Sequence, residues 1–423
     1  MKKNMETGDF SQPAVYPYLL GAYACVNAVP GVTMLVDGPK CAEAKAEYLY
    51  GSGDLFSDLL GHSAPNRVVC TGTSPERMTA DPESGIVARA GRMLETSSPE
   101  ACLLAPMPFA AVAGLDYARA LGPLFSSSGV PFSALPGSSL SGDWLAGYGD
   151  ALAALAGIMP LGRAARRPRK VAVVGNPMYR REYDCLGNVR ELESLAAAAG
   201  VELAVWPGGG SLRSSARELA GASAVIGLPH GLKAAEVLAR RMGVPFVGAP
   251  LPFGLAGTGA FLAAAARCAG RCAEMAAVIK EARARVYGRS ARLVSAVLSG
   301  GRAVCVIDPL LEPGLRSVLS DIGVEPAEVV HTSRAAGGRA GSAAGLKRLI
   351  KESFPGKCGL LISSNLSPFF VYVGGAYLEF GFPVYNRHCL EESPFLGYSG
   401  FLRFIEQAAN TVLAARKDPP YVV

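Results

Sequence analysis

Two segments limit the possible fold of this chain more than any other feature. In each, a basic residue precedes a short apolar run, and the run ends at a turn that contains proline. The segments are RKVAVVGNP at 169–177 and GRAVCVIDP at 301–309. A stretch with helical periodicity and a second apolar run follow each of them, and this spacing predicts right-handed parallel crossovers. We therefore expect an α/β protein.

Chain length and charge predict three domains. A chain of 423 residues is too long for one ordinary core, and a typical domain of roughly 150 residues gives about three. Domain boundaries are expected at a basic linker near residue 165 and at the end of a charged helix near residue 298. We predict three Rossmann-like domains with doubly wound parallel sheets, at 1–165, 166–298 and 299–423, the last with a C-terminal helix.

Composition narrows the choice of partners. Half of the residues are apolar and 18% are charged, which predicts much buried parallel sheet, a large subunit interface, or both. The net charge of +6 is spread out except for a basic run at 163–170. That run indicates a solvated linker or a patch for an acidic partner or nucleic acid. Aromatic residues do not interleave with it, so we expect no nucleic acid partner.

The uncharged stretch 14–36 is long enough for a membrane helix. It contains Pro17, Pro30 and two glycines, and its second half is β-branched, which favours a helix followed by a buried strand. Ten cysteines without an N-terminal signal pattern indicate a reducing compartment rather than a disulfide framework. We expect a cytoplasmic protein that does not enter a membrane.

Motifs for nucleotides and for common hydrolases are missing from the sequence. It contains neither GxxxxGK[ST] nor GxGxxG after a strand, so we expect the chain to bind no ATP or NAD. The glycine triplet 208–210 follows a strand and indicates either an anion site of backbone N–H groups or a tight turn. CxxC, HExxH and GxSxG are also missing, which removes the commonest zinc, metalloprotease and hydrolase classes.

Short motifs follow one another in a fixed order along the chain. They are GAYAC (21–25), VPGV (29–32), DGPKC (37–41), GSGDL (51–55), VVCTGTSPERMTAD (68–81), NVREL (188–192), WPGGGS (206–211), GFP (381–383) and PFLGYSG (394–400). In this order they resemble nitrogenase component 1 proteins from about residue 13 to 412. Each motif is short, and the resemblance rests on their order.

The resemblance implies both a fold and a function. It implies three Rossmann-like domains, a pairing with a second component 1-like subunit in a hetero- or homo-oligomer, and a [4Fe-4S] cluster shared at that interface. Electrons would come from a separate, ATP-dependent iron protein similar to nitrogenase reductase. The chain would be a subunit of an iron-sulfur oxidoreductase that reduces a small or tetrapyrrole-type substrate.

Two other interpretations remain open at this point. One is a non-catalytic paralogue or cofactor-assembly scaffold of the same fold, which the incomplete set of family cysteines favours. The other is a periplasmic-binding-like α/β protein for small ligands, which fits the strand pattern but lacks the expected export signal.

Three cysteines are candidate cluster and metal ligands by the resemblance. Cys41 keeps the family's second cysteine place. Cys70 lies a turn before the third place, where this chain has Ser74, and Cys25 lies in the helix that follows the first place, where it has Pro17. Thiolates suit iron because they are soft donors. The alternative for each is a small buried hydrophobic residue.

His388 is the candidate catalytic residue. It lies in the segment NRHC and matches the place of the histidine that holds the nitrogenase iron-molybdenum cofactor, so it would face substrate or cluster. The alternative is a histidine that only hydrogen-bonds a loop. The companion cysteine of that cofactor has no counterpart, because the matching place falls near Gly227, with His230 close by.

Other polar residues allow weaker hypotheses. Cys268 and Cys272 are four apart in an alanine-rich helical stretch, which fits a metal pair or core packing. The remaining cysteines, Cys185 among them, are expected to be structural and to lie in or beside strands or turns. Asp54 and Asp81 follow turns and are either proton relays or solvated loop acids.

Overall fold

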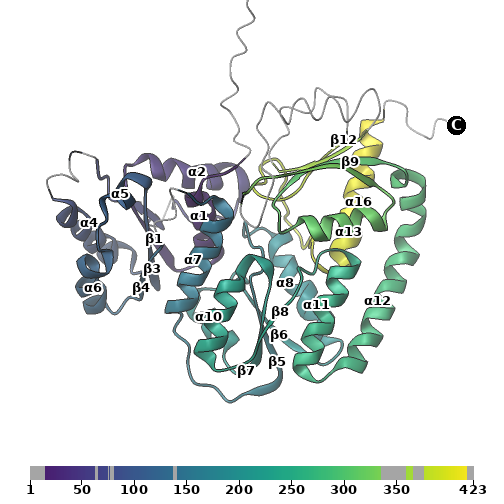
Figure 1. The fold of residues 1–423 in the computed structure, drawn as a ribbon, viewed down its shortest axis with the longest axis horizontal. Coiled ribbons are helices and arrows are strands. Elements are labelled where there is room, and N and C mark those ends of the chain that lie inside the picture. Colours follow the sequence, from purple (N-terminus) through teal and green to yellow (C-terminus); the bar gives the residue numbers. More distant parts are fainter. Residues whose placement is uncertain are drawn as a thin grey trace, which may run out of the picture.

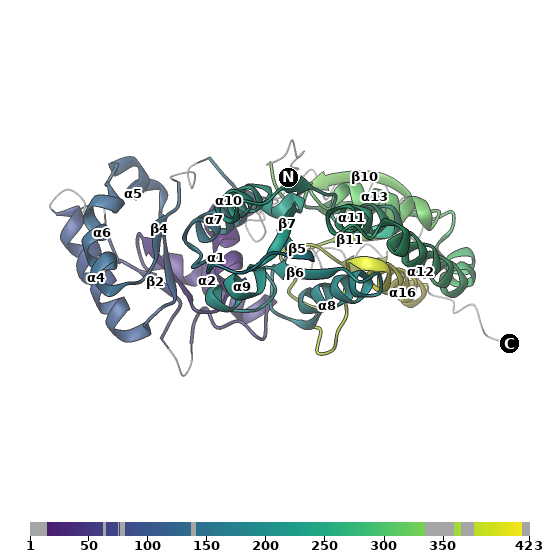
Figure 2. The same cartoon turned by 90° about the horizontal axis from the view of Figure 1, so that it is seen from below.

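The structure is a computed structural model, and it describes residues 15–61, 65–74, 76, 81–136, 141–334, 359–364 and 376–416. Its strands form three four-stranded sheets with parallel pairing. Figures 1 and 2 show three α/β units, and in Figure 2 they form a row. The predicted fold class, three Rossmann-like α/β units with parallel sheets, is confirmed.

The first unit has the strand order β2-β1-β3-β4. Its elements are α1 (Tyr18–Ala28), β1 (Val32–Asp37), α2 (Cys41–Gly53), β2 (Val68–Cys70), α4 (Pro82–Ser97), β3 (Ala101–Pro106), α5 (Pro108–Ala113), α6 (Tyr117–Ser128), β4 (Phe132–Ala134) and α7 (Trp144–Ile158). The helix and strand expected within 14–36 are therefore α1 and β1. Gly31, with φ of +81°, turns the chain between them.

Helices α1 and α7 cross with their backbones in contact. A Cβ atom on Gly21 would lie 1.6 Å from the carbonyl oxygen of Trp144, and one on Gly147 would lie 2.0 Å from that of Tyr18. Only glycine fits at either position. Since every residue of α1 except Asn27 and the glycine is apolar or aromatic and all are buried, this crossing holds α1 inside the first unit.

The second unit has the strand order β6-β5-β7-β8. Its elements are β5 (Arg167–Val174), α8 (Tyr183–Ala197), β6 (Glu202–Trp206), α9 (Leu212–Leu219), β7 (Ala222–Gly227), η2 (Pro229–Gly231), α10 (Leu232–Met242), β8 (Phe246–Gly248), α11 (Gly254–Ala269) and α12 (Cys272–Leu293). The basic run is thus a linker only up to residue 166. Beyond it the run belongs to β5, where Lys170 is buried and pairs with Glu202 at 3.4 Å.

The third unit repeats the topology with the order β10-β9-β11-β12. Its elements are η3 (Val294–Leu298), β9 (Arg302–Ile307), α13 (Glu312–Asp321), β10 (Glu325–His331), β11 (Leu360–Ser363), β12 (Ala376–Glu379) and α16 (Gly397–Ala415). Helix α16 also packs against α8, α11 and α12, so it connects the third unit to the second. The domain boundaries at 165 and 298 stay predictions.

Two large hydrophobic cores cross the unit boundaries. One joins α1 and α7 to the second unit and contains Trp144, Leu152 and Trp206, and the other joins the second and third units through Phe253 and Tyr398. A third, smaller core belongs to the first unit alone. The three units therefore share most of their buried apolar surface. No helix in the described part of the chain is long and apolar enough to cross a membrane.

One expectation about cysteines was wrong. Cys268 and Cys272 lie on different helices, because Gly270 adopts φ of +65° and ends α11 two residues before α12 begins. Cys185, expected in or beside a strand or turn, is the third residue of α8, just after the loop that precedes this helix. In an alanine-rich segment, the helical periodicity of the sequence continues across such a break. Gly270 was the sequence signal that could have located the end of the helix.

The glycine triplet forms the turn before α9, and a carboxylate of this same chain lies at that helix end. Glu100, from the first unit, accepts hydrogen bonds from the Ser211 hydroxyl (3.1 Å) and from the Arg213 N–H (3.0 Å). Negative charge is favourable at a helix N-terminus. The anion at this helix end is thus the Glu100 side chain, which contacts Ser211 and Arg213 and connects two units.

Candidate functional site

Cys41 and Cys70 lie at the start of α2 beside the same aromatic ring, which is that of Tyr23 in α1. Cys41 is the first residue of that helix, and Cys70 ends β2 in register with Val36 of β1. The Tyr23 hydroxyl donates to the Ala42 carbonyl oxygen at 3.1 Å. Burial raises the pKa of Tyr23 strongly, and the nearby charges of Cys70, Glu43 and Cys41 raise it further. We call Cys41, Cys70, Tyr23 and Glu43 the cysteine edge.

The two thiols of the cysteine edge differ in exposure. Cys41 is exposed, whereas Cys70 is buried with 3% of its surface accessible. Burial raises the pKa of Cys70 to about 12, the charge of Glu43 adds to the rise, and the charge of Arg89 opposes it. Since metal ligation needs the thiolate, binding at Cys70 would release a proton.

Cys25 does not share the neighbours of the cysteine edge. It is fully buried on α1, and burial alone raises the pKa of its thiol. The pKa of Tyr148, on α7, is raised by burial and next by the charge of Cys25, so this cysteine lies close to α7. Within the described ranges, no three His, Cys, Asp or Glu side chains converge in a way that could hold a metal ion.

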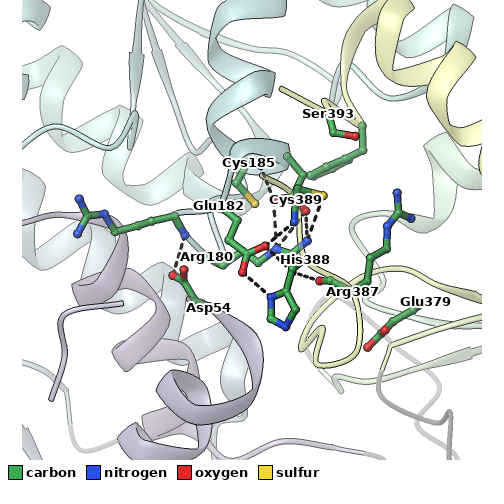
Figure 3. Close-up of polar contacts among 12 residues, drawn as sticks. Asp54, Arg180, Glu182, Cys185, Glu379, Arg387, His388, Cys389 and Ser393 are labelled. Carbon is green, nitrogen blue, oxygen red and sulfur yellow. Dashed lines mark hydrogen bonds and ion pairs between the residues drawn. The ribbon is translucent and has the colours of Figure 1, made fainter. Parts of the chain in front are cut away.

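Glu182 lies at the junction of the three units and is fully enclosed. Its Oε1 is 2.7 Å from Nδ1 of His388 and accepts from the N–H of Leu55 at 3.1 Å. Its Oε2 accepts from the N–H of Cys389 at 2.7 Å. Figure 3 shows the carboxylate facing His388. Burial alone would raise the pKa of Glu182, but the His388 bond and the charge of Arg180 bring it below its ordinary value.

Arg180 is held on three sides. Its Nε is 3.1 Å from both carboxylate oxygens of Asp184, its Nη1 donates to the Arg387 carbonyl oxygen at 2.6 Å, and its Nη2 is 3.8 Å from Sγ of Cys389. Burial favours a lower pKa, but the charge and hydrogen bond of Asp184 outweigh it, so the pKa of Arg180 is raised. The guanidinium therefore stays charged inside the protein and ties the second unit to the third.

Asp54 connects the first unit to this network. Its carboxylate accepts from Nδ2 of Asn27 at 2.6 Å, from the N–H of Arg181 at 2.8 Å and from the N–H of Phe56 at 2.9 Å. Burial raises the pKa of Asp54 above its ordinary value in spite of these bonds, and the charge of Glu182 contributes to the rise. The proton-relay role of Asp54 stays a prediction, whereas Asp81 caps α4 by accepting from the N–H of Ser84 at 3.1 Å.

A cavity of about 60 Å³ lies at this junction, and we call it the junction cavity. The first unit contributes Asn27 and the end of α2, the second contributes 179–180 and 184–185, and the third contributes Leu311, 379–384, part of 387–395 and α16. Its wall is mainly apolar and includes several phenylalanine rings. His388 does not line it, but lies in an adjoining open groove of about 860 Å³.

A buried triad stands behind the cavity wall. Tyr179, which lines the cavity, places its hydroxyl 2.6 Å from Nε2 of His230 and donates to Asp308 at 2.8 Å. Burial would raise the pKa of Asp308, but the charge of His230 and these hydrogen bonds lower it. The side chains of His230 and Asp308 are fully enclosed. This triad connects loops of the second and third units.

The structure thus separates the predicted site residues into three places. Cys41 and Cys70 lie together, Cys25 lies under α7, and His388 belongs to the junction, where it contacts Glu182. Sequence reasoning missed Glu182 and Arg180. A signal existed, because charged residues 180–184 directly follow the carboxyl end of the central strand β5, the usual place for function in open parallel sheets.

Three parallel sheets of the same strand order, packed around one junction, define a three-unit α/β protein of the Rossmann-like type. The model of the family "nitrogenase component 1 type oxidoreductase" matches residues 19–413, which is most of the chain. The chain belongs to this family.

Relatives and solved structures agree with this assignment. The nitrogenase molybdenum-iron protein beta chain of Frankia alni is 26% identical over 258 residues, or 54% of this chain and 47% of that protein. The chain thus matches about half the length of this curated relative. A solved structure described as nitrogenase Cp1 at pH 6.5 superposes with a TM-score of 0.79 at 17% identity and covers 97% and 96% of the two chains. Another, at pH 5, has a TM-score of 0.70 at 15% identity and covers 96% and 90%. These structures show the shared fold.

Proposed function

We propose that this chain is a subunit of a nitrogenase-like iron-sulfur oxidoreductase of the cytoplasm. It would accept electrons from an ATP-dependent iron-sulfur reductase and reduce a small or tetrapyrrole-type substrate. The observation that carries the proposal is the placement of Cys41 and Cys70 beside one ring at the cysteine edge, with Cys41 exposed. An exposed cysteine with a second, buried cysteine near it suits a cluster that a second subunit completes.

The residues of the cysteine edge fit one half of such a site. A [4Fe-4S] cluster is held by four ligands, usually thiolates, and the described residues bring two candidate thiols together here. Cys41 and Cys70 would therefore ligate two irons, and a second component 1-like subunit would supply the remaining ligands. When bound, the cluster supplies one-electron transfer at a potential set by its ligands and by solvent exposure. Cys25 remains a candidate ligand, but its position, fully buried beside α7, suits a shared cluster less well than the positions of Cys41 and Cys70.

The protein's own part in the reaction would be played at the junction. His388 can hold or release a proton, and its contact with Glu182 fixes the ring and leaves Nε2 for the groove. Because Glu182 has a lowered pKa, it keeps its charge at neutral pH and presents a carboxylate to the His388 ring. The apolar cavity wall would exclude water from the substrate.

Anaerobic purification tests the proposal most directly. The chain, alone and co-expressed with a component 1-like partner, is assayed for iron and sulfide and by electron paramagnetic resonance after dithionite reduction. We expect a cubane signal in the paired preparation, its loss in Cys41→Ala and Cys70→Ala, and no change in Cys272→Ala, a control in which the replaced cysteine is also exposed.

A scaffold or non-catalytic partner of the same fold is the second candidate. It is favoured by the fact that two, rather than three, of the candidate thiols meet within the described ranges. Iron that binds to the paired preparation but transfers to another protein without substrate reduction would support the scaffold. A preparation without iron, alone and with a partner, would remove the cluster assignment altogether.

A further inference from the structure

We propose that the junction cavity binds an anionic group of the substrate, a carboxylate or a phosphate, and that Arg387 is the residue that binds it. Nothing in the family assignment requires a charged substrate. The inference is drawn from the charges that line the cavity and from how each is already bonded.

Three arginines line the cavity, and two of them are fully engaged. Arg180 binds Asp184 and a carbonyl oxygen, as described above. Arg403 donates to the Ser393 hydroxyl at 2.9 Å and pairs with Glu406 at 2.9 Å. For the guanidinium of Arg387, the described part of the chain provides no hydrogen-bond acceptor and no ion-pair partner; only the carbonyl oxygen of this residue is used.

The acidic residues of the cavity wall make their hydrogen bonds and ion pairs with groups other than the Arg387 guanidinium. Asp54 accepts three hydrogen bonds, and Asp184 binds Arg180. Glu379 accepts from the N–H of Tyr385 at 2.7 Å and from that of Asn386 at 3.1 Å. Each carboxylate that lines the cavity therefore stabilises another group.

Burial makes this arrangement costly for Arg387 without a ligand. It is partly buried, burial lowers its pKa, and the charges of Arg180 and Arg403 lower it further, although Cys389 and Asp184 oppose them. A partly desolvated guanidinium gains most from a planar or tetrahedral anion that accepts two parallel N–H bonds. An anionic ligand would thus replace the missing counter-charge.

The dimensions define how such a ligand would lie. A cavity of about 60 Å³ holds a few waters or one small anionic group, not a whole metabolite. Arg387 also lines the adjoining groove of about 860 Å³, a volume typical of small-molecule sites. The anionic group would enter the cavity at Arg387, and the body of the ligand would lie in the groove, where His388 is exposed.

The proposed function is needed only to call this ligand the substrate. The anion site at Arg387 is inferred without it. Binding is tested on the purified full chain by calorimetric titration with 4-phenylbutyrate and with its uncharged isostere 4-phenylbutyramide, and inorganic phosphate serves as competitor. We expect the carboxylate to bind at least about 10-fold more tightly than the amide and phosphate to displace it.

Matched variants identify the residue. Arg387→Met should abolish the preference for the carboxylate, Arg387→Lys should retain part of it, and Arg217→Met, which removes an exposed arginine of α9 that lines neither the cavity nor the groove, should leave it unchanged. Unfolding midpoints show whether each variant folds; if Arg387→Met does not, Arg387→Lys must still weaken the preference.

Equal affinity for the two compounds, no binding of either, or a preference that survives in Arg387→Met would overturn the inference. The iron assay reports separately on the proposed function. Carboxylate binding in a chain that takes up no iron would keep the anion site and remove the redox role.

Discussion

The cysteine edge and the junction differ in how completely their polar groups are bonded. At the junction, Glu182, Arg180 and Asp54 each have several partners that come from two or three units. At the cysteine edge, Cys41 is exposed and Cys70 has a pKa of about 12 set by burial. The comparison shows that contacts within this chain organise the junction, whereas the cysteine edge keeps an exposed thiol, at the place where we propose a cluster shared with a second subunit.

The largest effect is expected where α1, the helix that carries Tyr23, crosses α7. It shows whether the position of α1 depends on this close crossing. Gly147→Ala places a methyl group 2.0 Å from the Tyr18 carbonyl oxygen, so we expect destabilisation by about 3 kcal/mol or more, or failure to fold. Gly149→Ala lies on the same helix with nothing within 4 Å of its new Cβ and should stabilise by about 0.5–1 kcal/mol. Urea unfolding measures both. Equal values would show that the close crossing is not a constraint.

The next effect concerns the junction. Glu182→Ala removes the enclosed carboxylate between His388 and Arg180 and leaves the N–H groups of Leu55 and Cys389 without their acceptor, so the free energy of unfolding should fall by about 3 kcal/mol. The exposed Glu391, changed to alanine, is the control and should shift it by less than about 0.5 kcal/mol. A small loss in the Glu182 variant would mean that water replaces the carboxylate.

A smaller effect distinguishes the two thiols of the cysteine edge. In the metal-free chain, Cys70→Ala should cost about 1 kcal/mol because the side chain is buried, and Cys41→Ala should cost less than about 0.5 kcal/mol. A thiol reagent should modify Cys41 in the native protein and spare Cys70, as mass spectrometry of the labelled peptides can show. If the reagent labels Cys41 only slowly in the isolated chain, the cysteine edge is not accessible to a partner subunit.

The smallest effect is in the pH dependence of stability. The folded pKa of Glu182 is below its unfolded value, so its contribution is present above about pH 4.3 and is lost as the pH falls through the folded pKa. Asp54 has a raised pKa and acts in the opposite sense, because its cost above the folded pKa is relieved as the pH falls.

Between pH 3 and 5, Glu182→Gln should therefore flatten the loss of stability in acid and Asp54→Asn should steepen it. Each change should be below about 1 kcal/mol for one pH unit. Unfolding curves at four pH values suffice. If the slope changes in the same direction in both variants, the two carboxyls do not experience opposite environments.

The fold was accessible from sequence because its signals are local. The apolar runs at 171–174 and 303–307 became the central strands β5 and β9, and the motif order identified the family. The break between α11 and α12 was local too, but only Gly270 marked it within a long apolar and alanine-rich stretch.

The junction could not be assembled from sequence in the same way. Its main contacts join residues more than 120 positions apart, such as Asp54 with Arg181 and Glu182 with His388. The family resemblance made His388 a candidate and a preceding turn made Asp54 one, but neither indicated which carboxylate would face which cation. Such pairing depends on how the three units pack, and one sequence does not report that packing.

The position of α16 affects the order in which the molecule is completed during synthesis. This helix supplies Arg403, Phe404 and Gln407 to the cavity wall, and it packs on α8 and α11, which are made more than a hundred residues earlier. Domains generally fold as the chain leaves the ribosome, N-terminal parts first. The first unit can form early, but a nascent chain cannot close the cavity until α16 has emerged. Completion of the cavity wall therefore depends on the emergence of this helix and not on the folding of the earlier units alone.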